Sequence, residues 1–408
     1  MDQRLVQGAI IALIMMFVLQ APQLGVMTVA FISIYLMALA VRPQKSDVIV
    51  KRALSHEEAR DGASIVVTVS VHNKGNAIHW CEIVDELPAG VVLNGSKNSQ
   101  LFSLARGGTS QWSYKFNACR GLYNWQKLHV NTGDFLGIFR DVSTYEVESQ
   151  LSVYPNWNTV GRLFLTPSRL FGYDGRITSK QSGAGADFFG VRQYALGDSL
   201  KRVNWRVSAK HRSLYVRDCL MERNTTVNIV VDARASVNKL EDHFDLFEKS
   251  LFAAASVADQ CLREGHKVSV TLVGHRTKKS VAGVGRKQFK HILATLASAE
   301  LGLEMGLESY HNRYFKYFDS RTVFVWVSPL IKKDFSPISS LVAMGYDVAV
   351  LSPSLLHEIK ETDVRHYLET VRGLIMNGIK SSGAVVLDWP CHKPLNSITQ
   401  QMQLMKRR

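Results

Sequence analysis

The sequence predicts a multidomain chain with a helical membrane anchor, an antiparallel β-sandwich and a doubly wound α/β domain. Three observations lead to this prediction. Residues 5–41 are uncharged and mostly apolar, residues 48–155 form short alternating runs between turn residues, and strands alternate with helices over residues 222–395. A chain of 408 residues also exceeds the usual size of one hydrophobic core, so at least two folding units are expected.

Residues 1–44 are predicted to form a transmembrane helical hairpin. One helix over residues 5–41 would far exceed a hydrocarbon core of roughly 30 Å, since each residue rises about 1.5 Å. The turn sequence Gln20-Ala21-Pro22-Gln23 divides this stretch into two short apolar spans, residues 5–19 and 24–41. Two helices therefore fit better than one.

The charges that flank this stretch predict its orientation. Arg4 precedes the first span, and four cations follow the second: Arg42, Lys45, Lys51 and Arg52. By the positive-inside rule both ends, and the rest of the chain, face the cytoplasm. The five scattered cysteines have no CxxC spacing, which agrees with a reducing compartment. The alternative is a cleaved signal peptide ending at Ala38-Leu39-Ala40, but the apolar region is several times too long for one.

Residues 48–155 are predicted to form an antiparallel β-sandwich of immunoglobulin-like type. The runs SIVVTVSVHNKGN and QWSYKFNA alternate apolar and polar side chains, and the turn sequences ELPAG, ARGG and NTGDFLG separate such runs. The histidines of this region lack the spacing of a metal site. We therefore expect it to present or support the rest of the chain.

Residues 222–395 are predicted to form an α/β domain with a mostly parallel sheet covered on both faces. The expected strands are residues 227–231, 268–273, 322–327, 348–351 and 384–387. The expected helices are residues 240–264, 287–298, 337–344 and 363–375. Ligands of such sheets bind beyond the carboxyl ends of the strands, where the sequence Val230-Val231-Asp232-Ala233-Arg234-Ala235-Ser236 falls.

This strand-end sequence resembles the Asp-x-Ser-x-Ser loop by which von Willebrand factor A-like domains hold a divalent cation. Asp232 and Ser236 match two positions, but Arg234 replaces the first serine. The resemblance implies a further acidic ligand after the strand at residues 322–327, where this chain has Ser328-Pro329, and a threonine for which residues 274–285 offer no convincing candidate. Two of the three ligand loops therefore depart from the pattern.

Arg234 offers five hydrogen-bond donors and a fixed positive charge, which would repel a cation. We predict that Arg234 substitutes for the ion by pairing with Asp232, so that the chain has no metal and no other cofactor there. The alternative is that Asp232 merely caps a loop, which also predicts no metal.

The connecting segment, residues 156–221, carries the most distinctive sequence, GADFFGVRQYALGDSLKRVNWRVSAKHRSLYVRD. A helix is expected over residues 199–210, with Asp198 as its cap and with basic side chains around Trp205. Ten residues of the segment form a regular pattern: Arg192, Tyr194, Gly197, Asp198, Lys201, Arg202, Asn204, Trp205, Lys210 and Arg217.

This pattern resembles the signature of the bacterial family called domain of unknown function 58. The upstream sequence RGLYNWQKLHVNTGDFLGIFR is similar to another stretch of that family, with Phe135-Leu136 where Pro-Phe is usual. The resemblance implies two N-terminal membrane helices, a β-sandwich, a von Willebrand A-like domain and a place in the bacterial inner membrane. It also implies a MoxR-type AAA+ ATPase as partner, in the assembly or maturation of protein complexes, and no enzymatic activity.

Two interpretations of the signature remain open. A helix that presents Trp205 among cations suits an acidic protein surface. Alternatively, Arg192, Asp198 and Arg202 form an internal salt-bridge lattice, and Asn204 and Trp205 lock the segment onto the α/β domain.

The leading functional prediction is a non-enzymatic, membrane-anchored adaptor or scaffold, because the usual nucleotide-binding, metalloprotease and hydrolase motifs are absent from the sequence. The alternative is a protein that binds nucleic acid or an anionic surface through the basic signature, which the net charge of +14 allows. The basic tail, residues 396–408, is expected either to touch anionic lipid or to be a frayed end.

Overall fold

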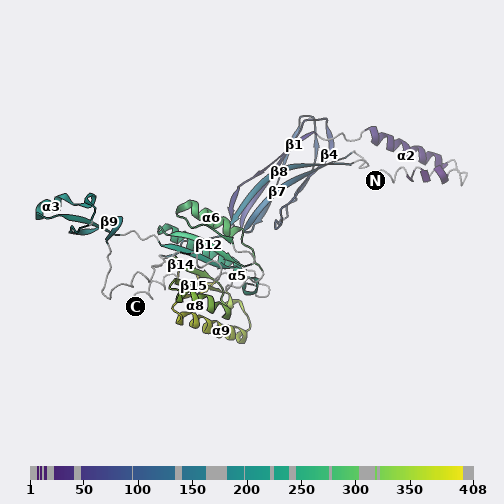
Figure 1. Ribbon diagram of the computed structural model, residues 1–408. Helices are drawn as coiled ribbons and strands as arrows, with labels where there is room; N and C mark the ends of the chain where they lie inside the picture. The colour runs from purple at the N-terminus through teal and green to yellow at the C-terminus, as the bar shows by residue number, and fades with distance from the viewer. Residues whose placement is uncertain are drawn as a thin grey trace. The chain divides into compact units, whose positions relative to one another are not determined.

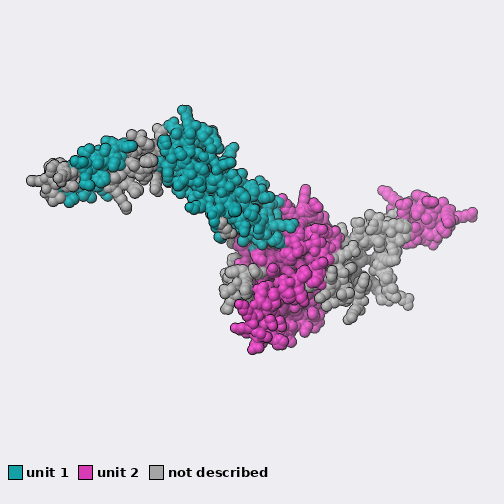
Figure 2. All heavy atoms as spheres, turned by 180° about the vertical axis from the view of Figure 1, so that it is seen from behind, with its two compact units in different colours: residues 1–156 teal, residues 157–408 magenta. Residues whose placement is uncertain are grey.

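The computed structural model of this chain describes residues 7–8, 10–11, 13–15, 23–40, 47–93, 95–133, 140–161, 182–196, 198–220, 225–238, 245–274, 278–302, 318 and 322–397. The chain divides into two compact units, Met1–Asn156 and Trp157–Arg408, which Figure 2 shows in different colours. Each unit is built from its own elements.

The first helix described over its full length is α2 (Gln23–Ala40), which covers most of the second predicted apolar span. The first predicted span, residues 5–19, lies mostly outside the described residues. Within the part of the chain that the structure describes, no helix combines the length and the apolar character needed to cross a membrane.

The first unit continues as two β-sheets. The smaller sheet has the strand order β1-β3-β6 and the larger sheet the order β2-β8-β7-β4-β5. Neighbouring strands are antiparallel except for β2 and β8. The strands are β1 (Val48–Leu54), β2 (Glu58–Arg60), β3 (Ala63–Asn73), β4 (Ile78–Asp85), β5 (Ser99–Leu104), β6 (Thr109–Ala118), β7 (Gly121–Gly133) and β8 (Arg140–Tyr154).

Alternating side chains from both sheets share one core, which makes this region sandwich-like. In β3 every second residue from Ile65 to Val71 is fully buried, as the alternating sequence predicts. The core also buries a polar network, in which Arg52 donates to both carboxylate oxygens of Asp85, at 2.9 and 2.5 Å. The hydroxyl of Tyr114 donates to Asp85 at 2.8 Å and accepts from the indole N–H of Trp125 at 3.1 Å.

The signature segment forms a β-hairpin with a helical insertion. Strand β9 (Ser182–Gln193) pairs in antiparallel fashion with β10 (Tyr215–Leu220). Between them lie a 3₁₀-helix, η2 (Leu200–Arg202), and the short helix α3 (Trp205–His211).

The predicted single helix over residues 199–210 is therefore wrong. The backbone of Val203 is extended and bridges to Val216, which separates the two helical turns. Asn204 then caps α3, accepting a hydrogen bond from the Val207 amide at 3.4 Å. Asp198 does not cap a helix, because its carboxylate pairs with Arg192.

The second unit is built around a six-stranded sheet with the order β13-β12-β11-β14-β15-β16 (Figure 1). All neighbouring strands are parallel except β12 and β13. The strands are β11 (Thr226–Asp232), β12 (Lys267–Val273), β13 (Lys278–Lys279), β14 (Thr322–Val327), β15 (Asp347–Ser354) and β16 (Val385–Pro390).

Helices pack against this sheet along the inner strands. The helices α8 (Phe335–Ala343) and α9 (Thr362–Ser381) contribute Ile338, Leu341, Met376 and Ile379 to a core shared with β11, β12, β14, β15 and β16. Helix α5 (Asp245–Arg263) contacts the central strands without joining that core, and α6 (Gly285–Ala297) packs on α5 and β12. The smaller elements are the helix α4 (Ala235–Asn238) and the 3₁₀-helices η4 (Lys332–Asp334) and η5 (Leu356–Glu358).

The coarse fold prediction is confirmed: a β-rich, sandwich-like region precedes a mixed, mostly parallel α/β sheet. The sequence did not predict β13, the antiparallel edge strand of only two residues. From β11 the chain adds β12 and β13 on one side of the sheet, and it then adds β14, β15 and β16 on the other side of β11. The carboxyl ends of β11 and β14 are therefore the switch point of the sheet.

Candidate functional site

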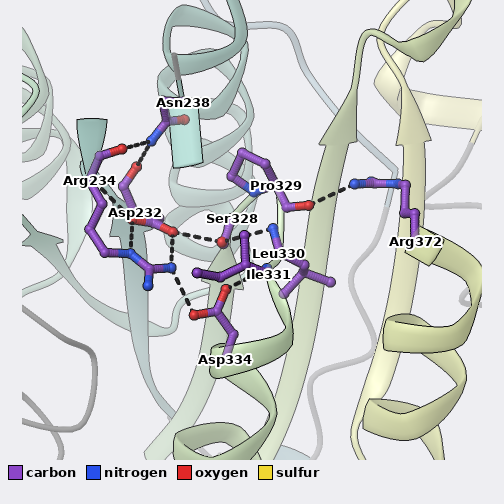
Figure 3. Close-up of polar contacts among 9 residues, drawn as sticks. All are labelled: Asp232, Arg234, Asn238, Ser328, Pro329, Leu330, Ile331, Asp334 and Arg372. Atoms are coloured by element: carbon purple, nitrogen blue, oxygen red, sulfur yellow. Dashed lines mark hydrogen bonds and ion pairs between the residues drawn. The ribbon is translucent and has the colours of Figure 1, made fainter. Parts of the chain in front are cut away.

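The carboxyl ends of β11 and β14 bring a group of charged and polar side chains together (Figure 3). Asp232 is the last residue of β11, and Ser328 directly follows β14. Because the two strands are parallel neighbours, both residues lie at the same edge of the sheet. The hydroxyl of Ser328 donates to Asp232 Oδ2 at 2.8 Å.

Arg234 is the central residue of this strand-end cluster, which we define as Asp232, Arg234, Ser328 and Asp334. Its Nε and backbone amide donate to Asp232 Oδ1 at 2.9 and 3.0 Å, and its Nη2 donates to Asp232 Oδ2 at 2.6 Å. The same Nη2 donates to Asp334 Oδ1 at 2.8 Å. One guanidinium therefore joins two carboxylates in the fork geometry that arginine favours.

The backbone around the cluster is held equally closely. Asn238 on α4 donates through Nδ2 to the carbonyls of Asp232 and Arg234, at 2.9 and 3.0 Å. Arg234 also forms a β-bridge with Gly302. These contacts fix the turn that carries Arg234 away from the end of β11 and back toward Asp232 (Figure 3).

A reversal of the chain after β14 brings Asp334 into the cluster. Leu330 adopts a left-handed conformation with φ of 69°, and its amide donates to Ser328 Oγ at 3.1 Å. The Ile331 amide then donates to Asp334 Oδ2 at 2.9 Å. This turn brings the Asp334 carboxylate to Arg234. Pro329, which stands where an acidic ligand was expected, has no carboxylate.

Burial sets the electrostatics of the cluster. The side chains of Asp232 and Asp334 are fully buried, and that of Arg234 is 5% exposed. Burial raises the pKa of Asp334 to about 6, because the opposing attraction of Arg234 does not fully offset it and Asp232 adds repulsion. Burial alone would lower the pKa of Arg234, but the two carboxylates outweigh this effect and raise it. Arg234 therefore stays charged.

The two carboxylates of the cluster are already held by donors from within the chain. Both oxygens of each carboxylate accept hydrogen bonds, and the guanidinium lies between them where a cation would have to bind. Among the described residues, no group of His, Cys, Asp and Glu side chains is arranged to hold a metal ion. The cluster therefore holds the ends of β11 and β14 together.

The ion pair predicted between Asp232 and Arg234 is present. Ser236, the other residue of the predicted loop, is exposed on α4, and no hydrogen bond within the described residues joins it to the cluster. Asp334 and Asn238 were missed. The only signal for Asp334 was an acidic residue shortly after a buried strand, since its approach depends on the turn at Leu330.

A second arginine braces the same edge of the sheet. Arg372 on α9 donates to the carbonyl of Pro329 at 2.7 Å (Figure 3). It also donates to the carbonyl and to Oγ of Ser352, at 2.9 and 2.8 Å. Its Nη2 also donates to Asp388 at 2.9 Å. Arg372 thus ties the ends of β14, β15 and β16 to α9.

The signature hairpin differs from this closed cluster because several of its basic side chains are exposed. Arg192 is an exception: its two terminal nitrogens donate to the Asp198 carboxylate, at 2.7 and 2.6 Å. The Tyr194 amide donates to the Leu214 carbonyl at 2.8 Å, and Val203 and Val216 form the buried side of the hairpin. These contacts belong to the structural interpretation of the signature.

Several other signature residues have exposed side chains. Trp205 is 66% exposed on the hairpin. The exposed cations of the hairpin are Lys201, Arg206, Lys210, Arg212 and Arg217. Gly197 and the side chain of Arg202 lie outside the described residues, as does most of the basic tail.

Fold and site together define a multidomain protein in which a β-rich, sandwich-like region precedes a signature hairpin and a mixed α/β sheet. Residues 190–356 match the family model described as "Protein of unknown function DUF58", which confirms the resemblance of the signature segment to that family. A relative is the uncharacterized protein YeaD of Bacillus subtilis (strain 168), which is 25% identical over 182 residues. The match covers 44% of this chain and 43% of that relative.

Two solved structures show weak local likeness to this chain. One is the CARDB domain of a Pyrococcus furiosus protein in complex with di-metal ions, with 13% identity, a TM-score of 0.19, and coverage of 26% of this chain and 93% of that one. The other is a complex of zinc α2-glycoprotein and prolactin inducible protein from human seminal plasma, with 13% identity, a TM-score of 0.20, and coverage of 26% and 95%. Scores this low establish no relationship.

Proposed function

We propose that this protein is a non-enzymatic adaptor or scaffold that binds a protein partner through its signature hairpin. The observation that carries the proposal is the exposure of Trp205 among exposed cations on and around α3. Exposed tryptophan and arginine side chains are the residue types that contribute most to protein–protein binding energy. The rest of the hairpin, tied by Arg192 and Asp198, supplies a rigid frame for them.

The closed strand-end cluster supports this assignment. In the von Willebrand A-like arrangement that the sequence suggests, a cation at this edge of the sheet would be the binding element. Here Arg234 satisfies both carboxylates from within the chain, so the edge offers a partner no vacant metal position. Partner recognition through another surface of the same family segment is therefore the simpler arrangement.

We infer a MoxR-type AAA+ ATPase, or the complex on which it acts, as the partner. The support is the match of residues 190–356 to the DUF58 family model, together with the functional setting that the signature implies. An adaptor of this kind needs no catalytic residues of its own. Its mechanical requirement is a stiff α/β sheet, which Arg372 and the strand-end cluster provide at the edge of β11, β14, β15 and β16.

We further propose attachment to the cytoplasmic face of the bacterial inner membrane through residues 5–41. The support is the absence of charge in this stretch and the exposure of apolar side chains along α2, among them Val26, Val29 and Met37. Carbonate extraction of membranes tests this proposal. The full chain is expected in the membrane pellet, and a chain without residues 1–44 in the supernatant; a full chain in the supernatant would contradict attachment.

Affinity capture from detergent-solubilised native membranes tests the adaptor function. The tagged wild-type chain is expected to retain a MoxR-type ATPase, identified by mass spectrometry, and Trp205→Ala is expected to lose it. Tyr367→Ala on α9 is the matched control, because Tyr367 is an equally exposed aromatic residue outside the signature. Equal retention by all three chains would show that the hairpin is not the binding element.

A further inference from the structure

The exposed side chains of α3 lie in two neighbouring rows on the helix surface. Trp205 and Ala209 are one helical turn apart, as are Arg206 and Lys210, so each pair lies side by side on the helix surface. Trp205 is 66% exposed, and Ala209 is exposed beside it. Ser208 is the buried residue of α3, and its hydroxyl accepts from the Tyr215 amide at 2.8 Å.

The cations of this surface repel each other. Arg206 and Lys210 are like charges at helical spacing, which costs an isolated helix about 0.2–0.5 kcal/mol. Lys201, Arg206 and Lys210 have no ion pair with any described residue, and the Asp198 carboxylate of the same hairpin is already held by Arg192. The segment thus maintains a positive surface that its own described carboxylates do not neutralise.

The apolar side chains on the same elements distinguish between two kinds of acidic partner. Leu200 is 62% exposed and directly precedes Lys201, and Trp205, which is 66% exposed, follows five residues after Leu200. Leucine and tryptophan gain free energy when a protein surface covers them, whereas phosphate contacts involve mainly cations and polar groups. The mixture of apolar and cationic side chains therefore favours a protein partner over a nucleic acid.

We propose that the α3 surface, defined as Leu200, Lys201, Trp205, Arg206, Ala209 and Lys210, binds an acidic protein segment that carries apolar side chains. Trp205 and Leu200 bury the apolar side chains of that segment, and Lys201, Arg206 and Lys210 pair with its carboxylates. This inference rests on the proposed adaptor function and specifies the chemistry of the partner.

The test measures binding of a labelled peptide of glutamate and leucine to the full chain in detergent, by fluorescence anisotropy. A peptide with glutamine in place of glutamate and a labelled DNA duplex are the comparison ligands. We expect the acidic peptide to bind most tightly, and both Trp205→Ala and Lys201→Ala to weaken its binding about tenfold or more. The exposed cations Arg286 and Lys287 on α6 supply the matched control, since the double alanine variant should bind as wild type does.

Three results would overturn the inference. The first is equal binding of the acidic and amide peptides, and the second is unchanged affinity in Trp205→Ala. The third is tighter binding of the duplex that Lys201→Ala weakens, which would assign the surface to nucleic acid. Circular dichroism confirms that each variant is folded, which is expected because both side chains are exposed.

The outcome can be separated from that of the adaptor proposal. If native membranes yield a partner that depends on Trp205 while the two peptides bind equally, the adaptor function stands and the acidic chemistry is wrong. If the peptide binds as expected but native membranes yield no partner, the surface chemistry stands and the adaptor function fails.

Discussion

Arg234 and Asp334 are one hundred residues apart in sequence, yet the Arg234 guanidinium donates to the Asp334 carboxylate at 2.8 Å in a buried position. This contact joins the turn after β11 to the 3₁₀-helix η4 after β14. With Asp232 on its other side, Arg234 closes the switch point of the sheet from within the chain. The cluster therefore links the ends of β11 and β14 through buried ion pairs.

Removing the arginine is expected to destabilise the α/β sheet strongly. Arg234→Ala leaves two buried carboxylates without their cation, and breaking a buried ion pair on one side costs about 3–5 kcal/mol. Urea unfolding at neutral pH, followed by circular dichroism, measures the loss. Arg286→Ala is the control, because Arg286 is an exposed cation on α6 and its removal should change stability by less than about 0.5 kcal/mol. Similar urea midpoints for Arg234→Ala and Arg286→Ala would show that the strand-end cluster does not stabilise the sheet.

Asp334 should give the chain a specific pH dependence. Its pKa rises from 3.8 to about 6 on folding, so the folded chain holds this proton more tightly than the unfolded chain does. The contribution of Asp334 to the free energy of unfolding is therefore largest below about pH 4 and is lost as pH rises to about 6. The full loss amounts to about 3 kcal/mol.

Comparing wild type with Asp334→Asn isolates this contribution from all other titrations. Urea unfolding between pH 4 and pH 7 should show wild type losing stability relative to the variant as pH rises. Parallel profiles, or a relative gain by wild type with rising pH, would contradict the shifted pKa of Asp334.

The sequence predicted the sheet far better than it predicted the cluster. The strand β14 has the predicted bounds, because a continuous apolar run between polar residues leaves little freedom in its ends. The Asp232–Arg234 pair was also predictable, since two residues in one short turn must lie close together. Asp334 was not, because its position depends on one left-handed residue, Leu330, for which leucine carries no sequence signal.

The signature helix shows the same limit. Apolar spacing at Leu200, Val203 and Val207 predicted one continuous helix, but Val203 pairs with Val216 across the hairpin instead. A long-range backbone contact thus overrides a local pattern. The exposure of Trp205 likewise depends on which face the hairpin buries, and sequence spacing alone left its role open.

The sandwich-like region contains a second buried ion pair whose environment can be tested through one hydroxyl. Tyr114→Phe removes a donor to Asp85 and the acceptor of the Trp125 indole N–H, at a cost of about 1–3 kcal/mol. Burial raises the pKa of Asp85 because it disfavours the charged carboxylate, and the hydrogen bond from Tyr114 stabilises that charged form. The loss of this hydrogen bond should therefore destabilise the strands around Asp85. Hydrogen exchange should become faster at β6 and β7 but not at β11 and β14. Tyr367→Phe, at an exposed position, should leave both regions unchanged.

The cap of α3 is expected to control the order of the signature surface. Asn204→Ala removes the side chain that accepts from the Val207 amide, which costs about 1 kcal/mol and is large for a helix of seven residues. Amide exchange in α3 should accelerate, while β9 and β10 keep their protection. Trp205→Ala should leave this exchange unchanged, since its side chain is exposed; equal acceleration in both variants would refute a capping role.

Two glycines of the α/β sheet are expected to respond in opposite ways to the same substitution. An added Cβ at Gly274, just after β12, would lie 2.9 Å from the carbonyl oxygen of Ala233. Because that contact is with backbone beside Arg234, Gly274→Ala must displace the turn that carries the cluster, at a cost of about 1–3 kcal/mol.

At Gly373, within α9, an added Cβ meets nothing within 4 Å. Gly373→Ala should therefore stabilise the chain by about 0.5–1 kcal/mol, since alanine favours the helix and restricts the unfolded chain. Urea unfolding of both variants measures the two shifts against wild type. If Gly274→Ala lowers the free energy of unfolding by no more than Gly373→Ala raises it, the turn after β11 accommodates the added Cβ at little cost. The cluster would then not hold this turn as rigidly as its hydrogen bonds indicate.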